Sequence, residues 1–218
     1  MILQGNPDKE TNLSLSENLF RQLRADILQG RLKIGEKLTE QRVCGEYEVS
    51  RTPVREAFQK LEIDGLIQMI PNRGAFVVGF TEQDIADMYE LRKSYEIQAV
   101  KWAIERMSQE EFDEIEETFE FMEFYTNKND VDKMQNINSK FHSLIYAASH
   151  NKMLMHFLSS YQLYIKYRRR EKKDSQEYLN AVLADHRAIY EAMKTRNVAA
   201  GIEAMAAHMN NVKLRAGL

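Results

Sequence analysis

The 218-residue sequence is poor in the residues that mark several common classes of protein. Its one cysteine, Cys44, cannot form an internal disulfide, and its first residues lack the basic and then apolar pattern of a secretory signal. No apolar run approaches the length of a membrane span. Only three prolines and nine glycines interrupt the chain. We therefore expect a soluble, mainly helical protein of the cytoplasm, with no membrane segment and with room for two domains.

Basic charge, the simplest sign of a nucleic-acid partner, is not in excess. The formal net charge is −3, and residues 1–80 contain 11 Lys and Arg against 11 Asp and Glu. A DNA-binding surface in this part of the chain would need its basic side chains gathered by geometry. A lone copy would then bind weakly, so the composition favours a homodimer on a two-fold symmetric DNA site.

The stretch from Val49 to Phe58 is the first that indicates a function. Ser50 is a helix-capping residue, and Pro53 is tolerated in the first turn of a helix because it lacks an N–H. A helix is therefore predicted to begin here. Two guanidinium groups, a hydroxyl and free backbone amides near its N-terminus can bind phosphate oxygens and guanine edges. The side chains expected to do so are those of Arg51, Thr52 and Arg55.

The residues before this helix favour a helix-turn-helix. Thr39 is expected to cap a preceding helix that reaches about Tyr47. The small residues Cys44 and Gly45 would let the two helices cross closely before a short turn. An earlier amphipathic helix, at about 16–29, would pack behind both of them.

The residues after this helix predict a wing. Gly65 ends the helix, and two apolar, β-prone runs follow, at 66–70 and 75–78. The turn between them carries Arg73 at its tip. Residues 1–80 are thus predicted to form a winged helix-turn-helix DNA-binding domain. The alternative is that the arginines belong to a solvated face and that the hairpin is ordinary core.

Residues 81–218 contain helical patterns and no convincing strand. A capping signature begins at Thr81, which places the domain boundary near residue 80. The expected helices are about 84–107, 109–125, 131–148, 153–172, 176–194 and 198–214. Six helices with short breaks predict an antiparallel bundle, and the fold class is mainly α.

Three of the five histidines are candidates for a site inside this bundle. His142 follows Asn138 by one helical turn, and His186 and His208 lie on apolar helix faces. Neutral imidazoles on rigid helices suit divalent transition metals such as Zn, Ni or Mn, and Asn138 would add an oxygen ligand. Spacing alone does not establish that the three histidines meet. Each could instead be a hydrogen-bonded core residue.

The N-terminal third resembles the DNA-binding domain of the GntR family of bacterial transcription regulators. The similarity lies in residues 38–41, 49–57 and 61–67 and in the Arg-Gly pair at 73–74. Gln41 stands where many members have a DNA-contacting arginine. The resemblance implies that operator DNA is contacted by Ser50, Arg51, Thr52, Arg55, Arg73 and Gly74.

The second domain resembles the FCD domain, the ligand-binding domain of the FadR-type branch of that family. The similar motifs are Leu91-Arg92 with Glu96, Asn138-xxx-His142, Asp185-His186-Arg187-Ala188-Ile189, and His208. Many members hold a metal there through an aspartate and three histidines, and the metal binds a small organic acid. The resemblance implies that the metal ligands are Asn138, in the aspartate position, with His142, His186 and His208. It also implies that Arg92 contacts the effector or supports the site.

These features predict a transcription regulator, most simply a repressor, that binds a pseudo-palindromic operator as a homodimer and responds to a small carboxylate effector. Without a metal, an organic anion could bind directly through Arg92, Asn138 and a protonated histidine. The alternative function is a histidine-ligated metalloenzyme, although the chain contains no His-Glu-x-x-His and no Glu-x-x-His. The arginine run at 168–170 is interpreted as a solvated face, from which one side chain could reach the site.

Overall fold

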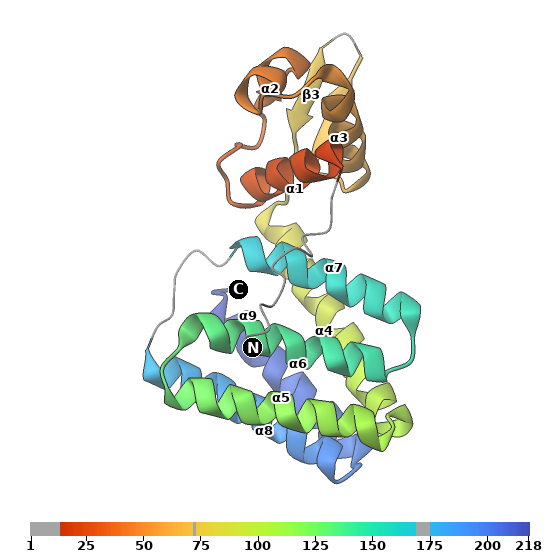
Figure 1. Cartoon of the computed structure of the whole chain (residues 1–218), viewed down its shortest axis with the longest axis vertical. Helices are drawn as coiled ribbons and strands as arrows, with labels where there is room; N and C mark the ends of the chain where they lie inside the picture. Colours follow the sequence, from red (N-terminus) through yellow and green to blue (C-terminus); the bar gives the residue numbers. More distant parts are fainter. Residues whose placement is uncertain (1–13, 72, 169–174) are drawn as a thin grey trace, which may run out of the picture. The chain divides into compact units, whose positions relative to one another are not determined.

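The computed structural model describes residues 14–71, 73–168 and 175–218, without the side chains of 163–168. The predicted role of the arginine run at 168–170 therefore lies outside the described residues. The chain divides into two compact units, Met1–Phe80 and Thr81–Leu218 (Figure 1). Each unit has a hydrophobic core of its own. The expectation of a mainly helical fold is confirmed.

The first unit, as far as it is described, combines three helices with a three-stranded antiparallel sheet. Its elements are α1 (Leu15–Leu28), β1 (Lys37–Leu38), α2 (Glu40–Glu46), α3 (Arg51–Ile63), β2 (Ile67–Ile70) and β3 (Gly74–Val77). The strand order is β1-β3-β2. The winged helix-turn-helix is therefore present, with β2 and β3 as its hairpin. Strand β1 was not predicted, because two residues are too few to reveal an alternating pattern.

Two details of the helix-turn-helix differ from the sequence prediction. Ser50 occupies the N-cap position of α3 but makes no side-chain capping hydrogen bond. A capping hydroxyl accepts from the second or third helical N–H, and the third residue here is Pro53, which has none. The predicted role of Gly45 in close helix crossing is wrong, because a Cβ built on it would meet no atom within 4 Å. Val43, which is 1% exposed, is the residue of α2 that is fully buried.

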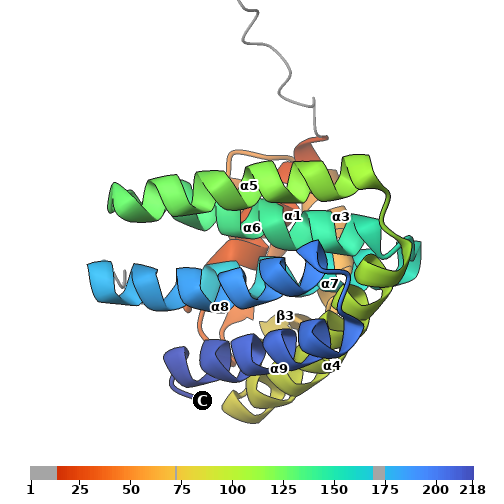
Figure 2. The ribbon, with the colours of Figure 1, turned by 90° about the horizontal axis from the view of Figure 1, so that it is seen from below.

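Within the described residues, the second unit contains six helices. They are α4 (Glu82–Arg106), α5 (Gln109–Asn127), α6 (Val131–Ala148), α7 (Lys152–Arg168), α8 (Gln176–Lys194) and α9 (Val198–Arg215). Five of them form a closed ring in which α4 packs on α6, α6 on α5, α5 on α8, α8 on α9, and α9 on α4. Figure 2 shows this succession from α5 at the top to α9 and α4 at the bottom. Helix α7 packs against α4 and α6 from outside the ring.

Apolar side chains fill the ring. Phe119 of α5, Phe141 of α6 and Met205 of α9 are at most 2% exposed and belong to one core cluster. Among the described residues, no helix is both long enough and apolar enough to span a bilayer. The interior of the ring is a hydrophobic core that also contains a cluster of buried polar side chains.

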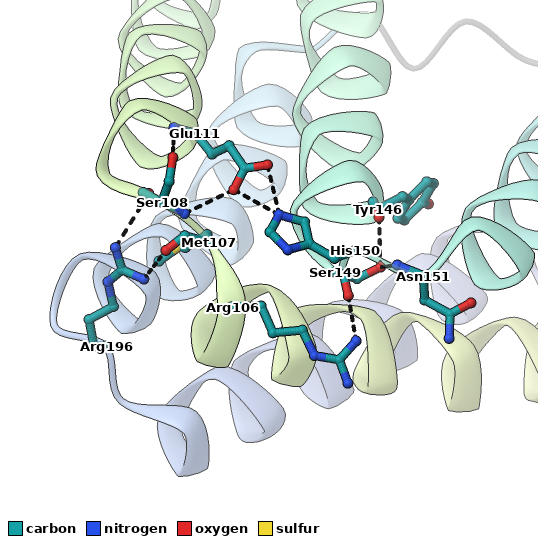
Figure 3. A network of polar contacts seen from close by, with 9 residues as sticks. All are labelled: Arg106, Met107, Ser108, Glu111, Tyr146, Ser149, His150, Asn151 and Arg196. Carbon is teal, nitrogen blue, oxygen red and sulfur yellow. Dashed lines mark hydrogen bonds and ion pairs between the residues drawn. The ribbon is translucent and has the colours of Figure 1, made fainter.

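Arginine side chains hold the end of α4 against neighbouring segments (Figure 3). Arg106, the last residue of α4, donates to the carbonyl of Ser149 at 2.7 Å, and Arg196 donates to the carbonyl of Met107 at 2.7 Å. The hydroxyl of Ser149 donates in turn to the carbonyl of Tyr146 at 2.7 Å. Carbonyls at helix C-termini lack partners within the helix, so these bonds satisfy them. They also fix the position of α4, which carries two side chains of the site described next.

Candidate DNA-binding surface and histidine site

The side chains predicted to contact DNA lie at the solvent-facing N-terminus of α3 and on the wing. The exposed residues are Ser50, Arg51, Thr52, Arg55 and Arg73, and Gly74 is half-buried. The opposite face of α3, with Val54 and Leu61 at 0% exposure, anchors the helix in the core. Gly74 has a φ of 94°, a conformation that suits glycine and lets β3 begin directly after the turn. The arrangement thus presents two arginines and a hydroxyl on a rigid helix.

Glu40, which was not predicted as part of this surface, holds one of these arginines. Its Oε1 accepts from Arg55 Nε at 2.7 Å, and the Arg55 side chain is 64% exposed. The hydrogen bond from Arg55 lowers the pKa of the Glu40 carboxyl below its ordinary value. Glu40 begins α2 and Arg55 lies on α3, so the pair joins the two helices of the motif. Sequence spacing carries no signal for a contact that depends on how two helices cross.

Three histidines from three helices of the ring meet in the core of the second unit. His142 of α6, His186 of α8 and His208 of α9 are 2%, 0% and 3% exposed. One ligand nitrogen of each ring can be chosen so that all three lie within 4.8 Å of one another. Phe141 covers the edge of this group, with its ring centroid 5.5 Å from that of His186. The prediction that these histidines converge is confirmed.

The orientation of two imidazoles follows from their hydrogen bonds. His186 Nδ1 lies 2.7 Å from the carbonyl oxygen of Val182, which can only accept, so Nδ1 carries the proton. His142 Nδ1 lies 3.3 Å from Glu96 Oε2 and is oriented in the same way. The two Nε2 atoms then face each other at 3.3 Å. Two nitrogen lone pairs at this separation repel each other unless a proton or a metal cation lies between them.

His208 completes the group. Its Nδ1 lies 3.7 Å from Asp185 Oδ2, and its Nε2 has no hydrogen-bond partner. Burial lowers the pKa of His208 to about 4, and burial together with the neighbouring histidines lowers the pKa of His186 well below its usual range. Both imidazoles are therefore neutral at neutral pH, which is the form that binds a metal. The rings of His142 and His186 are oriented through Nδ1 by an oxygen outside the group, as metal-binding histidines are, and His208 Nδ1 faces the Asp185 carboxylate at 3.7 Å.

Glu96 is the buried carboxylate beside this group, and it was not predicted as a site residue. It is 0% exposed, and its Oε1 accepts from Arg92 at 2.9 Å and from the Tyr146 hydroxyl at 2.6 Å. Burial alone would raise the pKa of Glu96, but the charges of His142 and Arg92 and these hydrogen bonds hold it below its ordinary value. The sequence feature that could have indicated a role for Glu96 is its spacing from Arg92, because the two residues are one turn apart on α4.

Arg92, the predicted effector contact, is therefore engaged inside the protein. Its side chain is 8% exposed, and both Nε and Nη2 bond to Glu96. Asp185, the other carboxylate near the histidines, forms an ion pair with Arg215 at 2.7 Å and accepts a hydrogen bond from Asn211 at 2.9 Å. Both acidic side chains beside the histidines thus have an arginine partner.

Asn138 lies one turn before His142 on α6, and its Oδ1 is buried without a hydrogen-bond partner. The residues fit a divalent transition metal on three observations: the neutral imidazoles of His186 and His208, the unpartnered oxygen of Asn138 and the unpartnered Nε2 of His208. Ligands about 2.0–2.1 Å from a tetrahedral zinc lie roughly 3.3 Å apart. The two facing Nε2 atoms have this separation.

Comparison with known proteins gives two family matches along the chain. Residues 15–77 match the model described as bacterial regulatory proteins, gntR family, and residues 87–211 match the FCD domain. An uncharacterized HTH-type transcriptional regulator of Bacillus subtilis, YdhC, is 30% identical over 94% of this chain and 91% of its own length. The gluconate operon transcriptional repressor of the same organism is 28% identical over 88% of this chain and 81% of its length.

A solved structure shares the fold of the whole chain. McbR/YncC of E. coli is similar with a TM-score of 0.69 and 21% identity, over 94% of this chain and 97% of that one. The metalloenzyme alternative receives no support from these matches, which all lie among transcription regulators. The chain belongs to the GntR family of bacterial regulatory proteins, in the group with a C-terminal FCD domain, and is a DNA-binding transcription regulator rather than an enzyme.

Proposed function

We propose that this regulator is a repressor whose second unit, residues 81–218, binds a divalent transition metal together with a small carboxylate effector. The protein acts as a homodimer, and the first units, residues 1–80, read the two halves of a pseudo-palindromic operator. The name of the gluconate operon repressor, a relative that controls genes for a sugar acid, supports both repression and an organic-acid signal.

The observation that carries the proposal is the convergence of three buried imidazoles on one point. Their nitrogens lie within 4.8 Å of one another, and the unpartnered Asn138 Oδ1 is placed on the same helix face as His142. Asn138 Oδ1 and His208 Nε2 are buried without a hydrogen-bond partner, which is unfavourable because unsatisfied polar atoms are costly in a core. A cation bound there compensates this cost. The metal ligands in this proposal are Asn138, His142, His186 and His208.

Control of DNA binding requires that the effector favour one arrangement of the dimer over another, because equal affinity for both would shift nothing. Four helices of the ring carry the residues of the site: α4, α6, α8 and α9. Of these, α4 begins at Glu82, two residues after the first unit ends. A displacement of α4 caused by ligand binding would therefore be transmitted directly to the DNA-binding unit.

Metal content tests the site. Protein purified without a histidine tag should carry about one Zn, Ni or Mn per chain, and His142→Ala should remove it. His156→Ala is the matched control, since His156 is an exposed histidine on α7 outside the group. Equal metal content in the wild type and His142→Ala, or none in the wild type after dialysis against Zn and Ni, contradicts the proposed site.

Gel retardation tests DNA binding, with DNA from upstream of the protein's own gene. Arg51→Ala and Arg55→Ala should each weaken binding and lower the slope of log K against log salt by about 1 if they contact phosphates. Arg21→Ala serves as the control, because Arg21 is an exposed arginine on α1 that pairs with Glu17. Retardation that is unchanged in all three variants would exclude the N-terminus of α3 as the DNA-binding surface.

A further inference from the structure

The basic side chains of the first unit fall into two groups according to their ion pairs. Those paired with a carboxylate are Arg21, Arg24, Arg31, Arg42, Arg55 and Lys60. Within the described residues, those in no ion pair are Lys33, Lys37, Arg51 and Arg73. Residues 1–80 contain equal numbers of acidic and basic residues, so the positive potential of this unit comes mainly from the cations that no carboxylate neutralises. Arg51 and Arg73 already belong to the proposed DNA-contact surface.

Lys37, which the sequence did not indicate as a DNA contact, lies beside the wing. It is the exposed residue of β1, and it pairs with Phe76 of β3. Its Cε is 3.5 Å from the point that a Cβ on Gly74 would occupy. Gly74 stands two residues before Phe76 and begins β3 directly after the wing turn. The Lys37 side chain therefore extends diagonally across the strand pair toward the turn that carries Arg73.

Lys37 is also close to the N-terminus of α3. Three residues further along the chain, Glu40 begins α2 and forms its ion pair with Arg55 of α3 at 2.7 Å. Three residues of extended chain span at most about 11 Å, so the backbone of Lys37 lies within this distance of the backbone of Glu40. Lys37 is thus near both parts of the proposed DNA-contact surface, the start of α3 and the wing.

We infer that Lys37 binds a phosphate of the DNA backbone, so that the DNA-contact surface continues from α3 and the wing onto β1. This inference rests on the proposed surface at α3 and the wing. An ammonium group on a flexible stem is a point charge with three donors, which suits phosphate oxygens and carries no base code. Because no ion pair holds Lys37 among the described residues, phosphate binding breaks no existing contact of its charge. Lys37 therefore adds affinity for DNA of any sequence.

A different role for Lys37 would be to protect the edge of the sheet. Strand β1 lies at an edge in the order β1-β3-β2, and lysines on edge strands discourage pairing with other chains. That role alone would make a neutral variant associate with itself and would leave its DNA affinity unchanged. The nearness of Lys37 to the wing turn favours the phosphate contact, and titration with DNA separates the two roles.

Fluorescence anisotropy with two labelled duplexes tests the phosphate contact. Full-length wild type and Lys37→Gln are titrated onto a duplex from upstream of the protein's own gene and onto a scrambled duplex of the same composition, at several salt concentrations. Lys37→Gln should weaken binding to both duplexes by the same factor, at least about threefold at low salt, and lower the slope of log K against log salt by about 1 for each bound protomer. Lys37→Arg keeps the charge and should stay within about twofold of the wild type on both duplexes.

Lys33→Gln is the matched control. Lys33 is exposed and forms no ion pair with described residues, but it lies at the other end of the sheet, since Gly35 donates to the carbonyl of Val77, where β3 ends. Lys33→Gln should leave both the affinity and the salt slope unchanged. Equal thermal-unfolding midpoints for the wild type and the two variants would show that a loss of DNA binding does not come from unfolding.

An unchanged salt slope in Lys37→Gln, or an equal loss of affinity in Lys33→Gln, would overturn the inference. A loss confined to the upstream duplex would also overturn it, because a phosphate contact acts on every sequence. Failure of the proposed surface itself gives a different result, in which Arg51→Ala and Arg55→Ala, as well as Lys37→Gln, bind both duplexes as the wild type does.

Discussion

Glu96→Gln should destabilise the metal-free second unit by about 3–5 kcal/mol. The substitution keeps the shape of the side chain and removes its charge, and it leaves the guanidinium of Arg92, at 8% side-chain exposure, without a counter-ion. Removal of one partner of a buried ion pair typically has an effect of this size. The Tyr146 hydroxyl, which donates to the same Oε1 at 2.6 Å, would also lose a charged acceptor.

Removal of both charges should restore most of this loss. In Glu96→Gln/Arg92→Met the unpaired guanidinium is gone and an apolar side chain of similar length fills its place. Replacement of a complete buried pair is often close to neutral. We expect the double variant to lie within about 1–2 kcal/mol of the wild type, so that the two substitutions are far from additive.

Urea unfolding followed by tryptophan fluorescence reports on the stability of the second unit, which contains both Glu96 and the tryptophan. Trp102 is the single tryptophan of the chain and lies on α4, in the second unit. A loss of 3–5 kcal/mol corresponds to a shift of roughly 1.5–2.5 M in the urea midpoint when m is about 2 kcal/mol/M. Glu90→Gln, which breaks an exposed contact of α4 with Lys213, should leave the midpoint unchanged within error.

The reasoning would be refuted if Glu96→Gln lowered stability by less than about 1 kcal/mol, or if the double variant were as unstable as the sum of the two single ones. Either result would mean that Arg92 has another partner or reaches solvent. Arg92 would then be free to contact an anion directly, as the sequence first suggested.

Three further predictions concern packing, pH and DNA binding. Gly201→Ala should destabilise the second unit by about 1–3 kcal/mol, since the new Cβ would lie 2.4 Å from Ile104 Cδ1, and Ile104→Val should relieve the effect in a thermal-unfolding cycle. His208 should contribute about 2 kcal/mol to the stability that metal-free protein loses between pH 7 and pH 5 in urea titrations, because the unfolded chain protonates His208 near 6.5 while burial delays this in the folded chain to about 4. His186 adds a loss of the same sign, so His208→Gln should flatten the slope in part, and an unchanged slope would contradict the assignment. Glu40→Gln should tighten binding to a DNA duplex of scrambled sequence at low salt by roughly fivefold, because it releases Arg55 and removes a charge that repels phosphate. Fluorescence anisotropy measures this affinity, and an unchanged value would mean that Glu40 lies away from the phosphates.

Element boundaries and fold class could be predicted because their signals are local. Thr81 and Ser108 each form a capping box with the residue three positions later, so the starts of α4 and α5 are determined by hydrogen bonds within one turn. Helices α6 and α8 have the bounds expected from periodicity alone. Strand β1 was missed because it exists only by pairing with β3, some 38 residues further along the chain.

The histidine site also has some features that the local sequence determined and others that only the tertiary structure decided. Sequence alone determined which residue types stand on helix faces, and therefore that imidazoles at 142, 186 and 208 could meet inside a bundle. Tertiary structure decided that they do meet, since His142 and His186 are 44 residues apart and are brought to 3.3 Å by the packing of α6 and α8 in one ring. It also decided that the local pair of Arg92 and Glu96 is buried, and that Glu96 reaches His142 across 46 residues. Periodicity and capping act over a few residues, whereas the charge balance of a buried site depends on which helices become neighbours.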